Sequence, residues 1–223
     1  MTGSLLLVRH GETEWNLQRR YQGRSDSALT TTGIAQAHAI GRLLGALSYA
    51  ETARIMASPL GRARRTAEII REHFTTAPEL QFDDRLRELS LGSWDGLTYS
   101  EIAARCPGVF DGQGRYDWYF RSPDGERYDV FAARLGEWLF EHESAQALVV
   151  VTHGIVTRLL RGLYASLPRE LSLMLPVPQD KVFLLSGGSI EELPVRLPED
   201  CSALGEAGRG ETLRAATGKG RSR

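Results

Sequence analysis

The sequence has only two cysteines, Cys106 and Cys201, and they lie in unrelated contexts without C-x-x-C spacing. This pattern indicates neither a zinc site nor a disulfide framework, and it suits a thiol-reducing cytoplasm, where we expect the protein to reside. No stretch approaches the roughly 20 apolar residues that a membrane helix needs. The first apolar run, residues 5–8, is too short for a signal peptide and is followed at once by Arg9. We therefore expect no membrane as a partner.

The sequence also lacks an excess of either charge, because 27 basic residues face 28 acidic ones. A net charge of −1 gives no reason to expect nucleic acid or an anionic membrane as a partner. The length of 223 residues allows one domain or two. We expect a single domain over residues 1–197 with a lid or insert at about residues 97–127, then a polar, flexible tail over residues 198–223. A homodimer is compatible with the sequence, although no pattern in it demands one.

Two short apolar runs, residues 5–8 and 148–151, each lead into a histidine that is followed by glycine. Unbroken Leu and Val runs of this length are typical of strands that are buried on both faces, as in a parallel sheet covered by helices. Ligands of such sheets bind beyond the carboxyl ends of the strands. If the two strands are neighbours, His10 and His153 meet at one place.

The rest of the chain alternates between short strands and helices of 10–16 residues. Helices are predicted over residues 30–47, 58–74, 97–105, 128–142 and 154–165, and strands over 54–57, 79–84, 182–185 and 189–193. Ser58 and Pro59 are interpreted as the cap and the first residue of the second of these helices. Alternating strands and helices imply right-handed crossovers and a parallel sheet between helix layers. The predicted fold is an α/β, three-layer α/β/α sandwich with a mostly parallel central sheet.

Four polar residues fall on the same rim of this sheet, at strand ends or helix starts: Arg9, His10, Arg62 and His153. Arg62 lies in the first turn of a predicted helix, a position that already favours anions. Two arginines can each hold an anion through paired N–H donors, so a phosphate or phosphate ester is the natural ligand. No H-x-H or H-E-x-x-H pattern or acidic ligand cluster accompanies the histidines, so we expect no metal.

The segment LVRHGETEWN, residues 7–16, resembles the signature of the histidine phosphatase superfamily, the phosphoglycerate mutase-like proteins. The resemblance continues in the order of the family over about residues 4–165. The further matching blocks are Gly23 to Ala37, Ser58-Pro59-Leu60 with Arg62-Ala63 and Thr66-Ala67, Leu86-Arg87-Glu88 with Trp94-Asp95-Gly96, Pro123 to Glu126 with Arg134, and residues 150–154 with Arg158-Leu159-Leu160. One departure is Arg127, which stands where a serine is usual.

The resemblance implies a role for each matching residue. His10 is the expected nucleophile, which forms a covalent phosphohistidine, and Glu88 is the expected proton donor to the leaving group. The remaining implied site residues are Arg9, Arg62 and His153, which bind the phosphoryl oxygens, and Asn16, Gln22, Gly23 and Gly154, which line the phosphate pocket. The family implies neither a metal nor an organic cofactor.

Physical chemistry supports these roles. A histidine attacks only as the neutral imidazole, and Arg9 and Arg62 should lower the pKa of His10. Glu88 would protonate the departing alkoxide and, once ionised, deprotonate the attacking water; we expect it to be partly buried near the anion. Asp95 and Glu101 remain alternatives for this acid.

Three functions fit these residues. The favoured one is a phosphomonoester hydrolase that takes a small-molecule phosphate ester and releases inorganic phosphate. A cofactor-dependent phosphoglycerate mutase is the alternative, and a non-catalytic phospho-ligand-binding protein is less favoured because no motif residue is missing. From Arg105 to Glu126 three arginines face four acids, which suits a less charged substrate and a broad-specificity phosphatase.

The aromatic stretch at residues 110–120 is interpreted as a lid that selects the leaving group through Trp118 and Tyr119, with ordinary core packing as the alternative. Packing or surface roles are predicted for five other residues: His38, His73, His142, Trp15 and Trp94.

Overall fold

The computed structural model describes residues 3–48, 50–111, 116–145 and 147–197. The predicted tail and residues 112–115 of the predicted lid lie outside this part. Its sheet has six strands in the order β3-β2-β4-β1-β5-β6. They are β1 (Ser4–Arg9), β2 (Arg54–Ala57), β3 (Leu80–Phe82), β4 (Leu148–Thr152), β5 (Lys181–Ser186) and β6 (Ser189–Pro194). The first four in this order pair in parallel, and the last two, which form a hairpin, are antiparallel.

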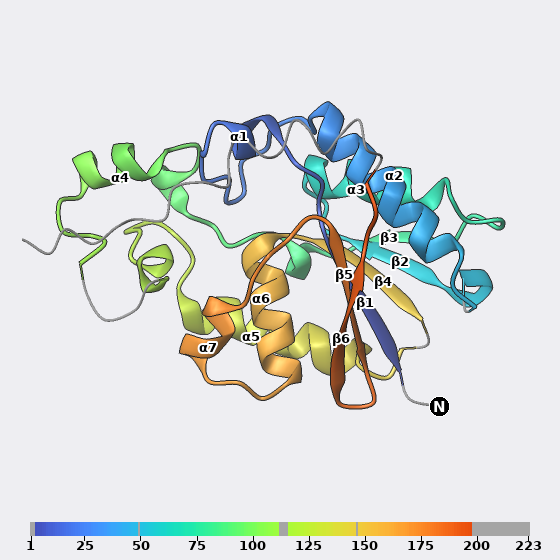
Figure 1. Ribbon diagram of the computed structural model, residues 1–223. Helices are drawn as coiled ribbons and strands as arrows, with labels where there is room; N and C mark the ends of the chain where they lie inside the picture. Colours follow the sequence, from blue (N-terminus) through green and yellow to red (C-terminus); the bar gives the residue numbers. More distant parts are fainter. Residues whose placement is uncertain (1–2, 49, 112–115, 146, 198–223) are drawn as a thin grey trace, which may run out of the picture.

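The two apolar runs form the neighbouring central strands β1 and β4, with Leu7 opposite Val150 in the register. Side chains of a strand alternate between faces, so Leu7 and Val150 enter one core with Trp138, whereas Leu6 enters the other with Ile40. Helices α2 (Thr31–Gly45) and α3 (Gly61–Arg71) cover one face of the sheet, and α5 (Tyr128–His142) and α6 (Gly154–Tyr164) cover the other (Figure 1). The predicted three-layer α/β/α sandwich is therefore confirmed.

The predicted start of the second helix was wrong. Helix α3 begins at Gly61 with Leu60 as its N-cap residue, so Ser58 and Pro59 precede it. The reason lies in the contacts of Ser58: its hydroxyl oxygen accepts a hydrogen bond from the backbone N–H of Leu60 at 3.3 Å and also contacts the distant His153. Ser58 thus shapes the turn before the helix. Arg62 nevertheless falls in the first turn, as predicted.

The segment predicted as a lid or insert, residues 97–127, contains the helix α4 (Tyr99–Arg105) and the short 3-10 helix η4 (Asp117–Phe120). Trp118 is buried and packs edge-on against the rings of Tyr21 and Phe110, with centroids 4.8 and 5.0 Å away. This part of the segment therefore belongs to the core. The remaining short elements are α1 (Glu14–Leu17), η1 (Ala50–Thr52), η2 (Asp84–Leu86), η3 (Gly92–Trp94) and α7 (Arg169–Met174).

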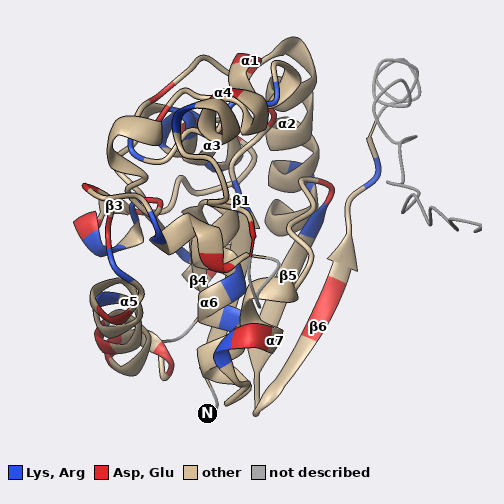
Figure 2. Cartoon of the chain, turned by 90° about the vertical axis from the view of Figure 1, so that its left-hand side faces the viewer, with Lys and Arg blue, Asp and Glu red and all other residues tan. Residues whose placement is uncertain are grey.

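Acidic and basic residues are interspersed along the elements, with an acidic stretch on the edge strand β6 (Figure 2). Over the described residues, every helix is too short or too polar to cross a membrane.

Candidate active site

His10 and His153 follow the ends of β1 and β4, which pair in parallel up to Arg9 and Thr152. Their rings lie 5.2 Å apart between centroids, and both side chains are buried. The prediction that the two histidines meet is confirmed, and it follows from the parallel register, in which the last residues of the two strands, Arg9 and Thr152, are partners.

The His10 ring is held with one nitrogen available for chemistry. Its Nδ1 lies 2.8 Å from the carbonyl oxygen of Gly11, which can only accept, so Nδ1 carries the proton. The lone pair therefore lies on Nε2, toward which Arg62 donates its Nε–H at 3.3 Å. Burial, together with the charges of Arg62 and Arg9, holds the pKa of His10 well below its usual range. His10 is thus a neutral imidazole at neutral pH, as a nucleophile must be.

Arg62 is fixed by the loop that precedes α2. It donates to the carbonyl oxygens of Gly23 and Ser25 at 2.8 and 2.7 Å, and pairs with Asp26 at 3.1 Å. Gly23 has a φ of +47°, and a Cβ there would lie 1.8 Å from Oδ1 of Asp95, so only glycine fits. The guanidinium is therefore placed beside His10 before any ligand arrives.

Arg9 has a buried nitrogen to spare. Its Nη1 donates to the carbonyl oxygen of Val177, whereas its Nε has no hydrogen-bond partner among the described residues. Burial lowers the pKa of Arg9 to about 10; the negative charge of Glu88 raises this pKa and the positive charge of Arg158 lowers it further. Arg9 therefore stays cationic at neutral pH and retains a donor for a ligand.

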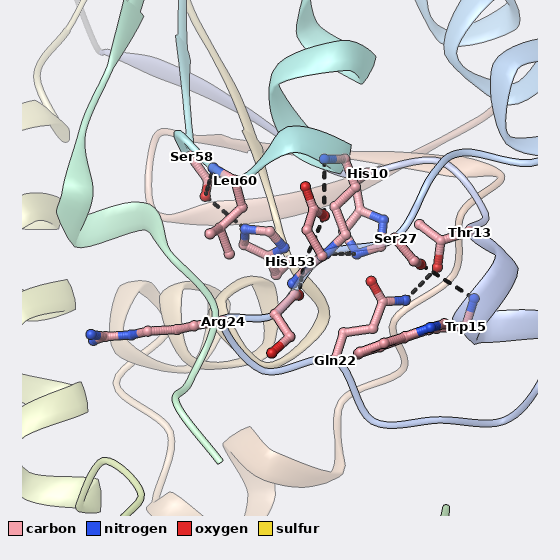
Figure 3. A network of polar contacts seen from close by, with 12 residues as sticks. His10, Thr13, Trp15, Gln22, Arg24, Ser27, Ser58, Leu60 and His153 are labelled. Atoms are coloured by element: carbon pink, nitrogen blue, oxygen red, sulfur yellow. Dashed lines mark hydrogen bonds and ion pairs between the residues drawn. The ribbon is translucent and has the colours of Figure 1, made fainter. Parts of the chain in front are cut away.

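His153 is held by Ser58, whose hydroxyl oxygen lies 2.7 Å from Nε2 (Figure 3). That oxygen also accepts from the N–H of Leu60, and the hydroxyl proton can go to Nε2, the direction that leaves the His153 proton on Nδ1. Nδ1 is buried without a partner in the described part of the chain. Burial and Arg62 keep the pKa of His153 well below its usual range, so with its proton on Nδ1 the ring is a neutral donor for an anion.

Glu88 brings a carboxylate to the same pocket. Its two oxygens accept from the backbone N–H groups of Leu89 and Ile155 at 3.0 and 3.1 Å, and the residue is 9% exposed, as expected for an acid near the anion. The alternatives are engaged elsewhere. Asp95 accepts from three backbone N–H groups, and Glu101 caps α4 and pairs with Arg20. Of the described carboxylates, Glu88 alone lines the pocket.

These residues border one pocket of about 290 Å³. Of the nine predicted site residues, eight line it; the ninth, His153, is buried, with its ring centroid 5.2 Å from that of His10. The predicted residues in the lining are Arg9, His10, Asn16, Gln22, Gly23, Arg62, Glu88 and Gly154. The rest of the lining consists of Arg19, Arg20, Tyr21, Leu89, Leu91, Tyr119, Ile155, Arg158 and Val177.

Sequence reasoning missed a residue that supports the nucleophile. Gln179 donates through Nε2 to the backbone oxygen of His10 at 3.0 Å and lies 3.3 Å from Oδ1 of Asn16. It comes from the segment before β5, far away in sequence and outside every recognised motif. Of the predicted lid residues, Tyr119 lines the pocket and Trp118 does not.

The remaining histidines pack away from the pocket. His38 and His73 share a hydrogen bond of 2.9 Å, and His142 stacks on Trp138 with centroids 4.7 Å apart. Within the described ranges, no group of three or more His, Cys, Asp or Glu side chains is placed to hold a metal ion.

A buried histidine pair between two arginines, at the carboxyl end of a parallel sheet, defines a protein that handles phosphoryl groups. The family model of the histidine phosphatase superfamily (branch 1) matches residues 5–187, and the chain belongs to this superfamily. Membership indicates an enzyme of phosphoryl transfer that acts on small phosphorylated substrates.

Some relatives of this chain are named as mutases and others as phosphatases. The chain is 34% identical to the probable phosphoglycerate mutase GpmB of Salmonella arizonae, over 91% of this chain and 98% of the relative. YhfR of Bacillus stearothermophilus superposes with a TM-score of 0.72 at 33% identity, over 86% of this chain and 96% of that one. A mycobacterial glucosyl-3-phosphoglycerate phosphatase superposes with a TM-score of 0.67 at 29% identity, over 86% and 97%.

Proposed function

We propose that this protein is a phosphomonoester hydrolase that acts through a phosphohistidine on His10. One observation carries the proposal: the Nδ1–H of His10 is bonded to a carbonyl oxygen, so the lone pair of Nε2 lies in a pocket with Arg62 and Glu88. A neutral nucleophile, fixed cations and a carboxylate are what stepwise phosphoryl transfer requires.

In the first step, Nε2 of His10 forms a bond to phosphorus while the bond from phosphorus to the ester oxygen breaks. Arg9, Arg62 and the Nδ1–H of His153 are placed to stabilise the charge on the equatorial oxygens. The protonated carboxyl of Glu88 gives its proton to the departing alkoxide, which leaves as the alcohol.

In the second step, water attacks the phosphohistidine. Glu88, now ionised, takes a proton from the water as the N–P bond breaks, and inorganic phosphate leaves. Glu88 lines the same pocket as His10, which supports its access to the reacting group. We place this activity in the cytoplasm.

The alternative, a cofactor-dependent phosphoglycerate mutase, returns the phosphoryl group to the substrate. The charge of the pocket favours the mutase, because the lining includes five arginines and only one acidic residue. The near-neutral lid segment, without a long basic insertion, favours hydrolysis instead. Relatives of this chain are named for each of the two activities.

The test is phosphate release from a panel of phosphomonoesters, measured beside the isomerisation of 3-phosphoglycerate. His10→Ala should abolish release, whereas the control His142→Ala, which changes a histidine on α5 away from the pocket, should retain it. Brief incubation with substrate labelled in the phosphoryl group should give an acid-labile phosphoprotein with wild type and none with His10→Ala. Wild-type turnover by His10→Ala would refute the nucleophile, and isomerisation faster than release would establish the mutase.

A further inference from the structure

The helix α6 places a buried cation, Arg158, on the wall of the pocket. Arg158 is 8% exposed, and no carboxylate among the described residues forms an ion pair with it. Burying a charge without a counter-ion is costly. The protein therefore keeps a cation beside the pocket at the expense of stability.

Neutral groups hold the Arg158 guanidinium in place. Its Nε donates to the carbonyl oxygen of Leu175 at 2.6 Å, its Cζ lies 4.4 Å from the centroid of the Tyr116 ring, and it shares a hydrogen bond with the Tyr119 side chain. These contacts fix the position of the guanidinium, but none of them supplies a negative charge. Tyr119 and Arg158 border the pocket together.

The other arginine of the same helix face provides an internal comparison. Arg161 is also buried, donates to the carbonyl oxygen of Pro176 and lies over the Phe183 ring, with Cζ 3.8 Å from the centroid. It does not line the pocket. Anchoring the 175–177 segment therefore does not require an arginine in the pocket wall, and the position of Arg158 calls for another explanation.

The lining between the phosphoryl end and Arg158 is partly apolar, through Leu89, Leu91 and Ile155. The negative charge of the transferred phosphoryl group is already met by Arg9 and Arg62. A ligand that filled the pocket with a neutral alcohol would leave Arg158 unpaired and would remove the water that can reach it. A ligand with an anion of its own would pair with it.

We propose that Arg158 and Tyr119 form a subsite for a second anionic group, so that the substrate is a small phosphomonoester whose alcohol part carries a carboxylate or a second phosphate. The planar guanidinium can hold either group through paired N–H donors. This inference rests on the proposed hydrolase for its reaction, but the subsite itself is a binding property and is testable without turnover.

The test uses pairs of ligands that differ only in the second anion. 3-Phosphoglycerate is compared with glycerol 3-phosphate, and propane-1,3-diol bisphosphate is compared with 3-hydroxypropyl phosphate. Dissociation constants are measured by calorimetry in the His10→Ala background, which blocks turnover, and kcat/KM is measured with His10 intact. One of the two pairs should show a preference of at least about tenfold for the anionic member, as expected of a charge-assisted hydrogen bond.

Arg158→Gln should abolish that preference. Two controls should each retain it within about threefold: Arg161→Gln, which removes a buried arginine outside the pocket, and Arg19→Gln, which removes an exposed cation of the lining. The first pair identifies a carboxylate and the second a phosphate. The subsite is refuted if neither pair shows a preference, or if a control loses it as fully as Arg158→Gln. Preferential binding without phosphate release would refute the hydrolase alone, and release without preference would refute the subsite alone.

Discussion

Replacing Ser58 with alanine tests how the second histidine binds the phosphoryl group. In the folded protein the Ser58 oxygen lies between the N–H of Leu60 and Nε2 of His153, at 3.3 and 2.7 Å. The neutral imidazole has two tautomers, and only the one protonated on Nδ1 can donate to an anion in the pocket. We infer that the Ser58 hydroxyl selects this tautomer by donating to the other nitrogen.

The size of the effect follows from the burial of the ring. Without the hydroxyl, the productive tautomer loses a neutral hydrogen bond and leaves Nε2 of the fully buried His153 unpaired, which together cost about 1–2 kcal/mol. This corresponds to a loss of about five- to thirtyfold in kcat/KM. The Nδ1–H of His153 would donate to bound inorganic phosphate as well as to the transition state. The inhibition constant for inorganic phosphate should therefore rise by a similar factor.

The assay compares Ser58→Ala with Ser172→Ala, which removes an equally buried hydroxyl on α7 that contacts only backbone oxygens. Both variants should lose some stability in urea unfolding, but only Ser58→Ala should bind phosphate more weakly. Nitrogen-15 spectra of the phosphate complex report the tautomer of His153 directly. A proton on Nε2 in the wild-type complex, or kinetic constants of Ser58→Ala within twofold of wild type, would refute the reasoning.

The other predictions concern the acid, the titration of the histidines and the aromatic segment. Glu88→Gln should lower the release of phosphate from alkyl esters by about 10²–10⁴-fold and from p-nitrophenyl phosphate much less, because an aryl leaving group needs no proton; equal losses would contradict the acid role. Burial keeps His10 and His153 neutral in the folded protein, whereas the unfolded chain binds a proton on each histidine below a pH of about 6.5. The free energy of unfolding should therefore fall as the pH drops below about 6.5, by up to about 1.4 kcal/mol per pH unit for each histidine. Urea unfolding at pH 7.5 and 5.5 checks this, and His10→Asn should reduce the dependence of the free energy of unfolding on pH. Trp118→Ala should cost about 3–5 kcal/mol of stability, whereas Tyr119→Ala should change the ratios of activity among substrates; a substrate panel and thermal unfolding of both variants separate the two effects.

The sheet and the core of the site could be predicted from the sequence because their determinants are local. Unbroken apolar runs define β1 and β4, and chain reversal through helices forces the two strands to be parallel. Residues that directly follow neighbouring parallel strands lie at the same edge of the sheet, so the sequence predicts that His10 and His153 meet if these two strands are neighbours, and the structure supplies that adjacency. Arg62 could be predicted at the same edge for the same reason, since it lies in the first turn of the helix that follows strand β2.

Other features depend on contacts that a linear pattern does not contain. Ser58 was interpreted as a helix cap, but its hydroxyl is occupied by His153, which is 95 residues away in sequence. Trp118 and Tyr119 are adjacent in the same aromatic stretch, yet one is buried in the core and the other lines the pocket. Only the path of the η4 turn decides which ring points which way, and residue type says nothing about it.

The segment from Leu175 to Gln179 shows how such contacts complete the site. Three consecutive carbonyl oxygens, those of Leu175, Pro176 and Val177, each accept from a different arginine, on α6 or at the end of β1. Gln179 then reaches the backbone of the nucleophile. A run of backbone acceptors carries no side-chain signature, so this part of the sequence looks like an ordinary loop. It nevertheless partly compensates the repulsion among clustered cations, and so allows the pocket to keep more positive charge than one phosphoryl group needs.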